Sequence, residues 1–302
     1  MLFPTTNVHI QPLEDPLFRE KQVSVSVLRL DKVHPVISGN KLFKLHYFLQ
    51  QARETQSTGL ITFGGAYSNH LVATAHAGKL AGLPTIGIVR GEPAAHLSGT
   101  LKACSGYGME MIFISRKLYA AKETGGYLEK LQQQFPGFTI IPEGGYHPLG
   151  AAGAAIIMDF ISPVNPTHIC CAVGTATTVA GLLMQLAPHQ QLLAFPVLKN
   201  LHDLEQRIEY LTNRSSPFQQ LSIVPDYHFG GYAKKNLALL DQMNAWYQQH
   251  RLPTDFVYTA KMMAGVYDLV KKDVIVPESR LVCIHTGGLQ GNDSLPGGSL
   301  NF

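Results

Sequence analysis

Two kinds of apolar pattern alternate along most of the chain. Short runs rich in β-branched residues predict buried strands, and longer stretches with apolar residues every three or four positions predict amphipathic helices. The predicted strands cover residues 59–65, 84–90, 109–115, 138–144, 167–174, 191–198, 221–225 and 280–288. This regular alternation is typical of an α/β protein with parallel sheets.

The helical stretches include NHLVATAHAGKLAG, which starts at Asn69, and KKNLALLDQMNAWYQQH, which ends at His250. In the second, Leu239, Met243 and Trp246 recur at helical spacing, so we expect the tryptophan to be a core residue. The chain has no internal repeat, low-complexity tract or Pro/Gly-rich linker. Composition alone therefore does not mark domain boundaries.

A further predicted helix begins within the segment HPVISGNKLFKLHYFLQQA, where residues 38–40 supply turn and capping chemistry. Leu42, Leu45 and Phe48 give it an apolar face, but Lys41 and Lys44 interrupt that pattern. Both lysines lie near the end of the helix where the dipole is already positive, so a cation is mildly unfavourable there. Either they are solvated surface residues, or they meet an anion and an electrophile.

Composition narrows the class of ligand. The chain has 302 residues, of which 45% are hydrophobic and only 15% charged, as expected of a globular protein with a sizeable core. A formal charge of +3 without any long basic run argues against nucleic acid as a partner and favours small molecules.

The chain shows no secretion or membrane signal. It does not start with a basic region followed by an apolar core, and no segment holds about eighteen uncharged apolar residues. We therefore expect a cytoplasmic protein that has no membrane partner. The four cysteines show no CxxC spacing and are interpreted as buried, reduced thiols.

Glycine-rich turns that follow a strand and precede a helix are where open α/β sheets bind ligands. In TFGGAYSNH, Ser68 is placed as an N-cap and Asn69 begins the helix. In CIHTGG, Thr286 leaves the last predicted strand, which is either an ordinary strand end or part of a site. A third turn has small residues whose backbone N–H groups converge on a helix N-terminus, and it suits a phosphate group. It consists of Gly174, Thr175, Ala176, Thr177 and Thr178.

Other chemistries lack support. The phosphate turn is neither a Walker loop nor a GxGxxG fingerprint, so a phosphate monoester is indicated and a nucleotide is not. The histidines form no HExxH or related ligand pattern, and we expect no metal. No GxSxG elbow is present for serine hydrolysis.

In their order along the chain, the segments SGNKLFKL, ITFGGAYSNH, PEGGYHPLGAAG, VGTATT, VYTAK and IHTGG resemble the fold type II pyridoxal-phosphate enzymes. Within these enzymes they are similar to the family of D-cysteine desulfhydrase and 1-aminocyclopropane-1-carboxylate deaminase. The resemblance implies a tryptophan synthase β-like fold with two open twisted α/β domains and pyridoxal 5′-phosphate between them. It also implies a homodimer. Residues 55–155 would form the small domain, and residues 1–54 and 156–302 the large one.

The resemblance also implies roles for individual residues. Lys41 matches the lysine that forms a Schiff base with the cofactor, and Lys44 matches a lysine that contacts its phosphate. Asn69 matches the residue that hydrogen-bonds the 3′-oxygen. Ser68, Tyr258 and Tyr232 match residues near the substrate. The phosphate cup would be Gly174, Thr175, Ala176, Thr177 and Thr178.

A physical reason supports the lysine assignment. A Schiff-base lysine must be available as a neutral amine, and both a helix N-terminus and a second ammonium lower its pKa. We therefore expect a lowered pKa for Lys41, caused by these two charges.

Two threonines bear on the choice of reaction. Thr259 stands where the deaminase has a glutamate that reaches the pyridine nitrogen, and Thr286 stands where it has an apolar residue. A hydroxyl leaves a weaker electron sink than a carboxylate, which suits β-elimination. We therefore expect a D-cysteine desulfhydrase-like lyase acting on a small amino acid. The alternatives are the deaminase, another pyridoxal-phosphate lyase, dehydratase or racemase for D-amino acids, and a cofactor-binding protein without catalysis.

Overall fold

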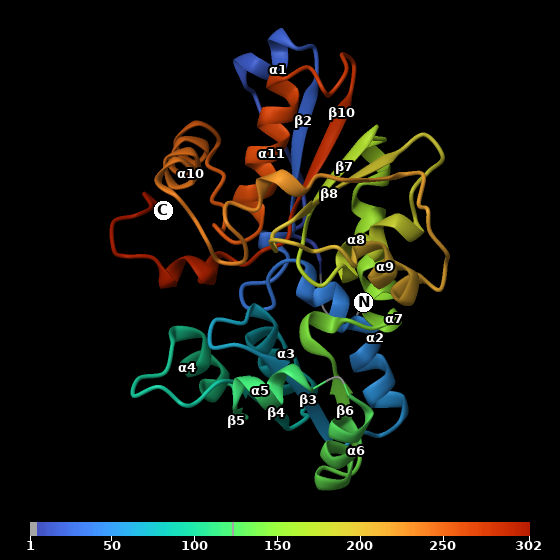
Figure 1. The fold of residues 1–302 in the computed structure, drawn as a ribbon, viewed down its shortest axis with the longest axis vertical. Coiled ribbons are helices and arrows are strands. Elements are labelled where there is room, and N and C mark those ends of the chain that lie inside the picture. Colours follow the sequence, from blue (N-terminus) through green and yellow to red (C-terminus); the bar gives the residue numbers. More distant parts are fainter. Residues whose placement is uncertain (1–4, 123) are drawn as a thin grey trace.

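The computed structural model describes residues 5–122 and 124–302 and contains two sheets, the larger in the upper half of Figure 1 and the smaller in the lower half. The larger sheet has six strands in the order β1-β2-β10-β7-β8-β9, and the smaller has four in the order β5-β4-β3-β6. Strand β1 pairs antiparallel with β2, and the other strand pairs are parallel. The strands are β1 (Ile10–Pro12), β2 (Ser24–Arg29), β3 (Gly59–Gly64), β4 (Thr85–Arg90), β5 (Met109–Ile114), β6 (Phe138–Ile141), β7 (His168–Val173), β8 (Gln191–Pro196), β9 (Leu221–Ile223) and β10 (Arg280–His285).

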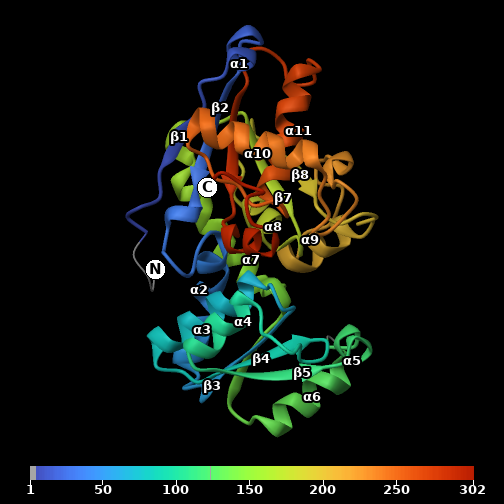
Figure 2. The ribbon, with the colours of Figure 1, turned by 90° about the vertical axis from the view of Figure 1, so that its left-hand side faces the viewer.

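Helices cover both faces of each sheet (Figure 2). On the larger sheet, one buried cluster joins α2, α7, α8 and α9 to the strands, and a second joins α1, α10 and α11 to the opposite face. On the smaller sheet, α3 and α4 cover one face, and α5 and α6 the other. The helices are α1 (Pro16–Glu20), α2 (Asn40–Glu54), α3 (Asn69–Ala81), α4 (Gly99–Gly106), α5 (Arg116–Ala120), α6 (Gly125–Gln134), α7 (Pro148–Ala155), α8 (Thr177–Met184), α9 (Leu204–Thr212), α10 (Leu237–His250) and α11 (Thr259–Lys271).

The expected α/β architecture is confirmed, and each predicted strand is present within a few residues of its expected limits. Two strands, β1 and β2, were not predicted, and β1 adds an antiparallel edge to the larger sheet. Strand β2 has the period-2 signal of a strand, because Val25 and Val27 are buried while Ser24 is exposed. Trp246 is a core residue as expected, and all four cysteines are buried and free.

Helix α2 lies between the two sheets in both views and begins beside the larger one (Figures 1 and 2). Glycines let α7 approach both α2 and α8 closely. A Cβ on Gly153 would lie 2.1 Å from the carbonyl oxygen of Phe43, and one on Gly181 would lie 2.4 Å from that of Ala151. Helix α7 belongs to the predicted small domain by residue number yet packs on α2 and α8, and the division at residue 155 stays a prediction.

In the part of the chain that the structure describes, no helix is both long enough and apolar enough to cross a membrane.

The close packing of α7 predicts a selective glycine effect. In Gly153→Ala the new Cβ meets the Phe43 carbonyl at 2.1 Å, so α2 and α7 must separate. We expect the free energy of unfolding, measured by urea titration, to fall by about 1–3 kcal/mol, as for other overpacked sites. Gly126→Ala in α6 is the control, because its Cβ would meet nothing within 4 Å. Equal stability of the two variants would contradict this account of the helix contact.

Candidate active site

The first turn of α2 is docked on the end of β10. Gly39 is the N-cap residue, with φ of 71°, and a Cβ there would lie 1.9 Å from the carbonyl oxygen of Thr286. That carbonyl accepts hydrogen bonds from the Asn40 N–H at 3.3 Å and from Lys41 Nζ at 3.4 Å. Side-chain capping was expected from residues 38–40, but no side chain caps α2, and the Ser38 hydroxyl donates to the Asp31 carbonyl.

Lys44 is buried and Lys41 is half-buried, which rules out the interpretation that both are solvated surface residues. Lys44 is only 6% exposed, and its Nζ donates to the carbonyl of Gly144 at 3.1 Å. Burial, together with the neighbouring Lys41 ammonium, lowers the pKa of Lys44 to about 7. Burial lowers the pKa of Lys41 to about 8, while the Asp255 carboxylate acts in the opposite direction. The predicted direction for Lys41 is correct, but the main cause is burial, not neighbouring positive charge.

The turn between β7 and α8 has the features of an anion site. Ala176 is the N-cap of α8 in the left-handed region, with φ of 68°, and no side chain caps this helix. The N–H groups of its first turn therefore have no partner within the helix. The hydroxyls of Thr175 and Thr177 lie 3.0 Å apart, and Thr178 Oγ1 accepts from Asn40 Nδ2 at 2.7 Å. The last bond ties the turn directly to the start of α2.

The Gly144 turn lies against this anion site. A Cβ on Gly144 would lie 2.8 Å from Cγ2 of Thr175, and one on Gly145 would lie 3.4 Å from Cβ of Lys44. The lysine ammonium, the glycine turn and the N-terminus of α8 thus form one cluster. Such a cluster combines a cation with free backbone donors, which is the chemistry that binds a phosphate group.

Two tyrosines lie near Lys41, and a Cβ on Gly174 of the anion site would lie 3.2 Å from Cε1 of Tyr258. The Tyr258 and Tyr232 rings meet edge to face with centroids 6.1 Å apart, and Lys41 Nζ is 5.6 Å from the centroid of Tyr258. Burial raises the pKa of Tyr258 well above its usual value, and Tyr232 raises it further. Tyr258 therefore keeps its proton at neutral pH and is a hydrogen-bond donor. Tyr232 is 47% exposed.

Ser68 and Asn69 begin α3. Ser68 is the predicted N-cap, since its hydroxyl accepts from the Leu71 N–H at 3.3 Å. Asn69 approaches the chain after β10, because a Cβ on Gly288 would lie 3.1 Å from Asn69 Nδ2. Among the described residues, neither Asn69 Oδ1 nor Thr259 Oγ1 has a hydrogen-bond partner, although both atoms are buried. Buried polar atoms without partners are rare and indicate a missing ligand.

These residues fit pyridoxal 5′-phosphate. The cluster at α8 suits the phosphate, and the lowered pKa of Lys41 suits an amine that joins an aldehyde. Asn69 and Thr259 each offer a buried polar atom that needs a partner. Within residues 5–122 and 124–302, no group of histidine, cysteine or acidic side chains has the arrangement of a metal site.

Asp255 was missed by sequence reasoning. Its side chain is buried and accepts from three successive backbone N–H groups, those of Val257 at 3.1 Å, Tyr258 at 2.7 Å and Thr259 at 2.9 Å. It thereby fixes the backbone that carries two of the predicted site residues. An aspartate three residues before a tyrosine that starts a helix is a recognisable capping signal, and it was available in the segment DFVYTAK.

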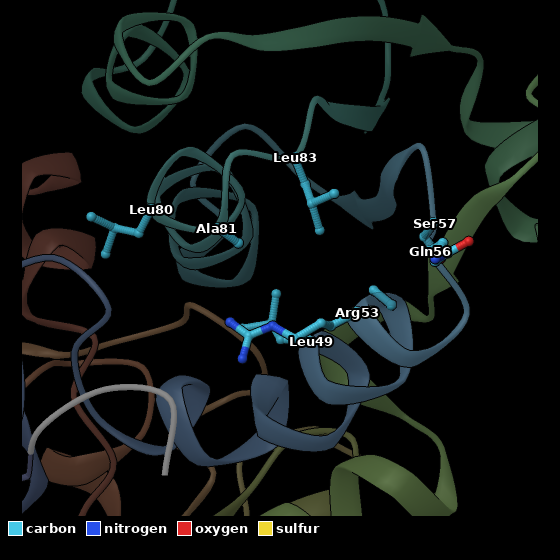
Figure 3. A pocket seen from close by; sticks show the side chains of 8 residues that line it. Leu49, Arg53, Gln56, Ser57, Leu80, Ala81 and Leu83 are labelled. Carbon is cyan, nitrogen blue, oxygen red and sulfur yellow. The ribbon is translucent and has the colours of Figure 1, made fainter.

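A cavity of about 520 Å³ lies away from this cluster, between the C-terminal ends of α2 and α3. Figure 3 shows Leu49 and Arg53 facing Leu80 and Ala81 across it. At about 1.5 Å per helical residue, this end of α2 is remote from Lys41. The cavity is therefore separate from the cluster of lysines and tyrosines.

Comparison with known proteins agrees with this geometry. A family described as "Pyridoxal-phosphate dependent enzyme" matches residues 5–287. Two proteins named "Putative 1-aminocyclopropane-1-carboxylate deaminase" are similar. The one from Pyrococcus abyssi is 28% identical over 90% of this chain and 87% of its own. The one from Thermotoga maritima is 29% identical over 89% of each chain.

Solved structures of pyridoxal-phosphate enzymes share this fold. The crystal structure of an "ACC deaminase homologue" superposes with a TM-score of 0.81 at 26% identity, covering 97% of this chain and 92% of that one. A hydrogen sulfide-producing enzyme from Fusobacterium nucleatum shares the fold, with a TM-score of 0.69 at 12% identity over 94% of this chain and 96% of that one. Together with the match over residues 5–287, these likenesses show that the chain belongs to the pyridoxal-phosphate dependent enzymes of fold type II.

Proposed function

We propose that this enzyme catalyses β-elimination on a small amino acid, with D-cysteine giving pyruvate, sulfide and ammonia. The observation that carries the proposal is the buried, unpartnered hydroxyl of Thr259 next to a carboxylate that is already occupied. Asp255 uses both oxygens on backbone N–H groups, so its carboxylate is held at the start of α11. With hydroxyls from Thr259 and Thr286 at that nitrogen, the electron sink is weak, and a weak sink favours rapid loss of a β leaving group.

We further propose which residues hold the cofactor. Lys44 pairs with the phosphate, whose remaining contacts come from backbone N–H groups of residues 174–178. Asn69 bonds the 3′-oxygen with its side chain, which has a buried free oxygen and an amide nitrogen facing Gly288. When bound, the cofactor's ring withdraws electrons from the substrate Cα, which makes the Cα proton acidic.

Lys41 then has the chemistry of the proton acceptor. With a pKa of about 8, a useful fraction of its amine is neutral near pH 7–8, whereas an ordinary lysine is almost fully charged. The Thr286 carbonyl orients its Nζ. Tyr258 keeps its proton, both Tyr258 and Tyr232 hydrogen-bond the substrate, and Ser68 orients the substrate carboxylate.

A second candidate is the 1-aminocyclopropane-1-carboxylate deaminase reaction. It is favoured by the names of the curated relatives, which match about nine-tenths of this chain. It would require the same lysine and tyrosines to open a cyclopropane ring. By analogy with the family, we also propose that the enzyme is a homodimer that works in the cytoplasm.

The assignment of Lys41 predicts a single site of covalent trapping. Borohydride should fix the cofactor on Lys41, because its amine lies beside Tyr258, whereas the Lys44 amine bonds the Gly144 carbonyl at the proposed phosphate site. Peptide mass spectrometry should find the adduct on Lys41 in the wild type and in Lys44→Ala, and should find none in Lys41→Ala. An adduct on any other lysine of the wild type would refute the assignment.

The lowered pKa of Lys44 predicts a pH-dependent affinity for the phosphate group. Lys44, with a pKa of about 7, must take up a proton when an anion binds above that pH, so affinity should fall as pH rises. Titration with 4′-deoxypyridoxine 5′-phosphate, which lacks the aldehyde, isolates this effect. Below pH 7, Lys44→Met should bind about 1.5–3 kcal/mol more weakly than the wild type, the range for a hydrogen bond to a charged group.

The affinities of the wild type and Lys44→Met should converge above about pH 9, because the bound anion stabilises the Lys44 ammonium by about 1.5–3 kcal/mol and so raises its pKa in the complex by about one to two units. A constant difference between them from pH 6.5 to pH 9 would show that Lys44 does not titrate as the structure indicates.

The proposed reaction predicts a product pattern. D-Cysteine and β-chloro-D-alanine should yield pyruvate faster than L-cysteine does, and 1-aminocyclopropane-1-carboxylate should yield little 2-oxobutyrate. Thr259→Val, which removes the hydroxyl at nearly constant volume, should lower kcat about tenfold, equivalent to about 1.4 kcal/mol, while Thr259→Ser should retain activity. Faster formation of 2-oxobutyrate than of pyruvate by the wild type would favour the deaminase instead.

A further inference from the structure

Lys261, in the first turn of α11, is completely buried and has no assigned role in the candidate active site. Its Nζ donates to two backbone carbonyls, that of His228 at 2.8 Å and that of Gly231 at 2.7 Å. Among the described residues it has no salt-bridge partner within bonding distance. Burial lowers the pKa of Lys261 to about 8 and Asp255 raises it, so the ammonium form still predominates at pH 7.

The two carbonyls belong to a turn with an unfavourable backbone. Phe229, Gly230, Gly231 and Ala233 all have positive φ, with values of 51°, 92°, 117° and 54°. Phe229 and Ala233 are not glycine, so the left-handed conformation strains them. Strained segments persist when surrounding groups fix them in place. Here the buried Lys261 ammonium bonds the carbonyl of His228, where the turn begins, and that of Gly231, at its centre.

Tyr232 lies within this strained segment. Helix α11 carries Tyr258 at its N-cap, about one helical turn before Lys261. The two tyrosine rings meet edge to face at 6.1 Å. Helix α11 therefore fixes both members of the pair, one as its own N-cap residue and the other through the lysine. An apolar side chain at position 261 would leave the carbonyls of His228 and Gly231 only their backbone donors, the N–H groups of Gly231 and Lys234, and the turn would lose its anchor to the helix.

We propose that Lys261 is a positioning residue, whose ammonium group holds the turn of residues 228–231 so that Tyr232 reaches Tyr258 in the active site. This proposal rests on the proposed function only where it assumes that Tyr232 contacts the substrate. The geometric part, that Lys261 orders the turn, stands independently.

The test compares Lys261→Met with the wild-type holoenzyme by hydrogen–deuterium exchange and by steady-state kinetics. Methionine keeps the unbranched apolar stem and removes the three donors. We expect amide exchange in residues 229–233 to rise at least tenfold while exchange in the rest of α11 changes little. We also expect kcat for the best substrate to fall about tenfold with the cofactor still bound.

Lys235→Met is the matched control. Lys235 lies just after the same turn, is exposed, and packs over the Phe256 ring without bonding the turn's carbonyls. Its loss removes the same charge from the same region, so exchange in the turn and kcat should both stay within twofold of the wild type.

A double variant tests whether Lys261 acts through Tyr232. If it does, Lys261→Met should change kcat less than twofold in a Tyr232→Phe background, because the group that it positions is already gone. The proposal would be overturned if the two substitutions lowered kcat independently, so that their fold-effects multiplied in the double variant. Unchanged amide exchange in residues 229–233 of Lys261→Met would also overturn it. If Lys261→Met fails to fold, Lys261→Gln replaces it. We then expect the same rise in amide exchange and the same fall in kcat, both smaller than for methionine. Absence of turnover by the wild type would reject the proposed function, and the exchange measurement would still decide the role of Lys261.

Discussion

The burial of two lysine ammonium groups in the first two turns of α2 is the constraint on which the candidate site depends. Taking a charge out of water is costly unless it is paired or its pKa shifts, and both lysines show the shift. Among the described residues, Lys44 has only the Gly144 carbonyl within hydrogen-bonding distance, so an anion placed there would recover part of the lost solvation. Gly39 and Gly153 contribute to this burial, because they let β10 and α7 approach α2, the helix that carries the two lysines.

Asp255 explains how one carboxylate can influence this cluster without neutralising it. Its oxygens are used by the N–H groups of residues 257–259, so it fixes the backbone at the start of α11. Its field still favours the charged form of Lys41, against the larger effect of burial. Helix α11 then carries Tyr258 and Thr259 to one side of Lys41 and, through Lys261, holds the turn that carries Tyr232.

Much of this site was predictable because its signals are local. Ser68 as a helix cap and the small-residue turn at residues 174–178 are read from a few adjacent residues, and the order of the motifs added the family. The rest depends on contacts between segments far apart in sequence. The burial of Lys44 against Gly144, and of Lys261 against Gly231, follows from how the helices and turns pack, which no local pattern encodes. Strand β2 is different, because its alternation of valine and serine was readable.

One physical effect assigns opposite roles to neighbouring groups in this site. Burial disfavours charge, so it lowers the pKa of a lysine and raises that of a tyrosine. Lys41 is brought to about 8, while Tyr258, whose ring lies 5.6 Å from Lys41 Nζ, is moved well above its usual value. At neutral pH the amine is therefore able to accept a proton and the phenol is able only to donate one. The proposed elimination would need both a group that removes the Cα proton and a donor that stays protonated beside it, and burial favours both of these states.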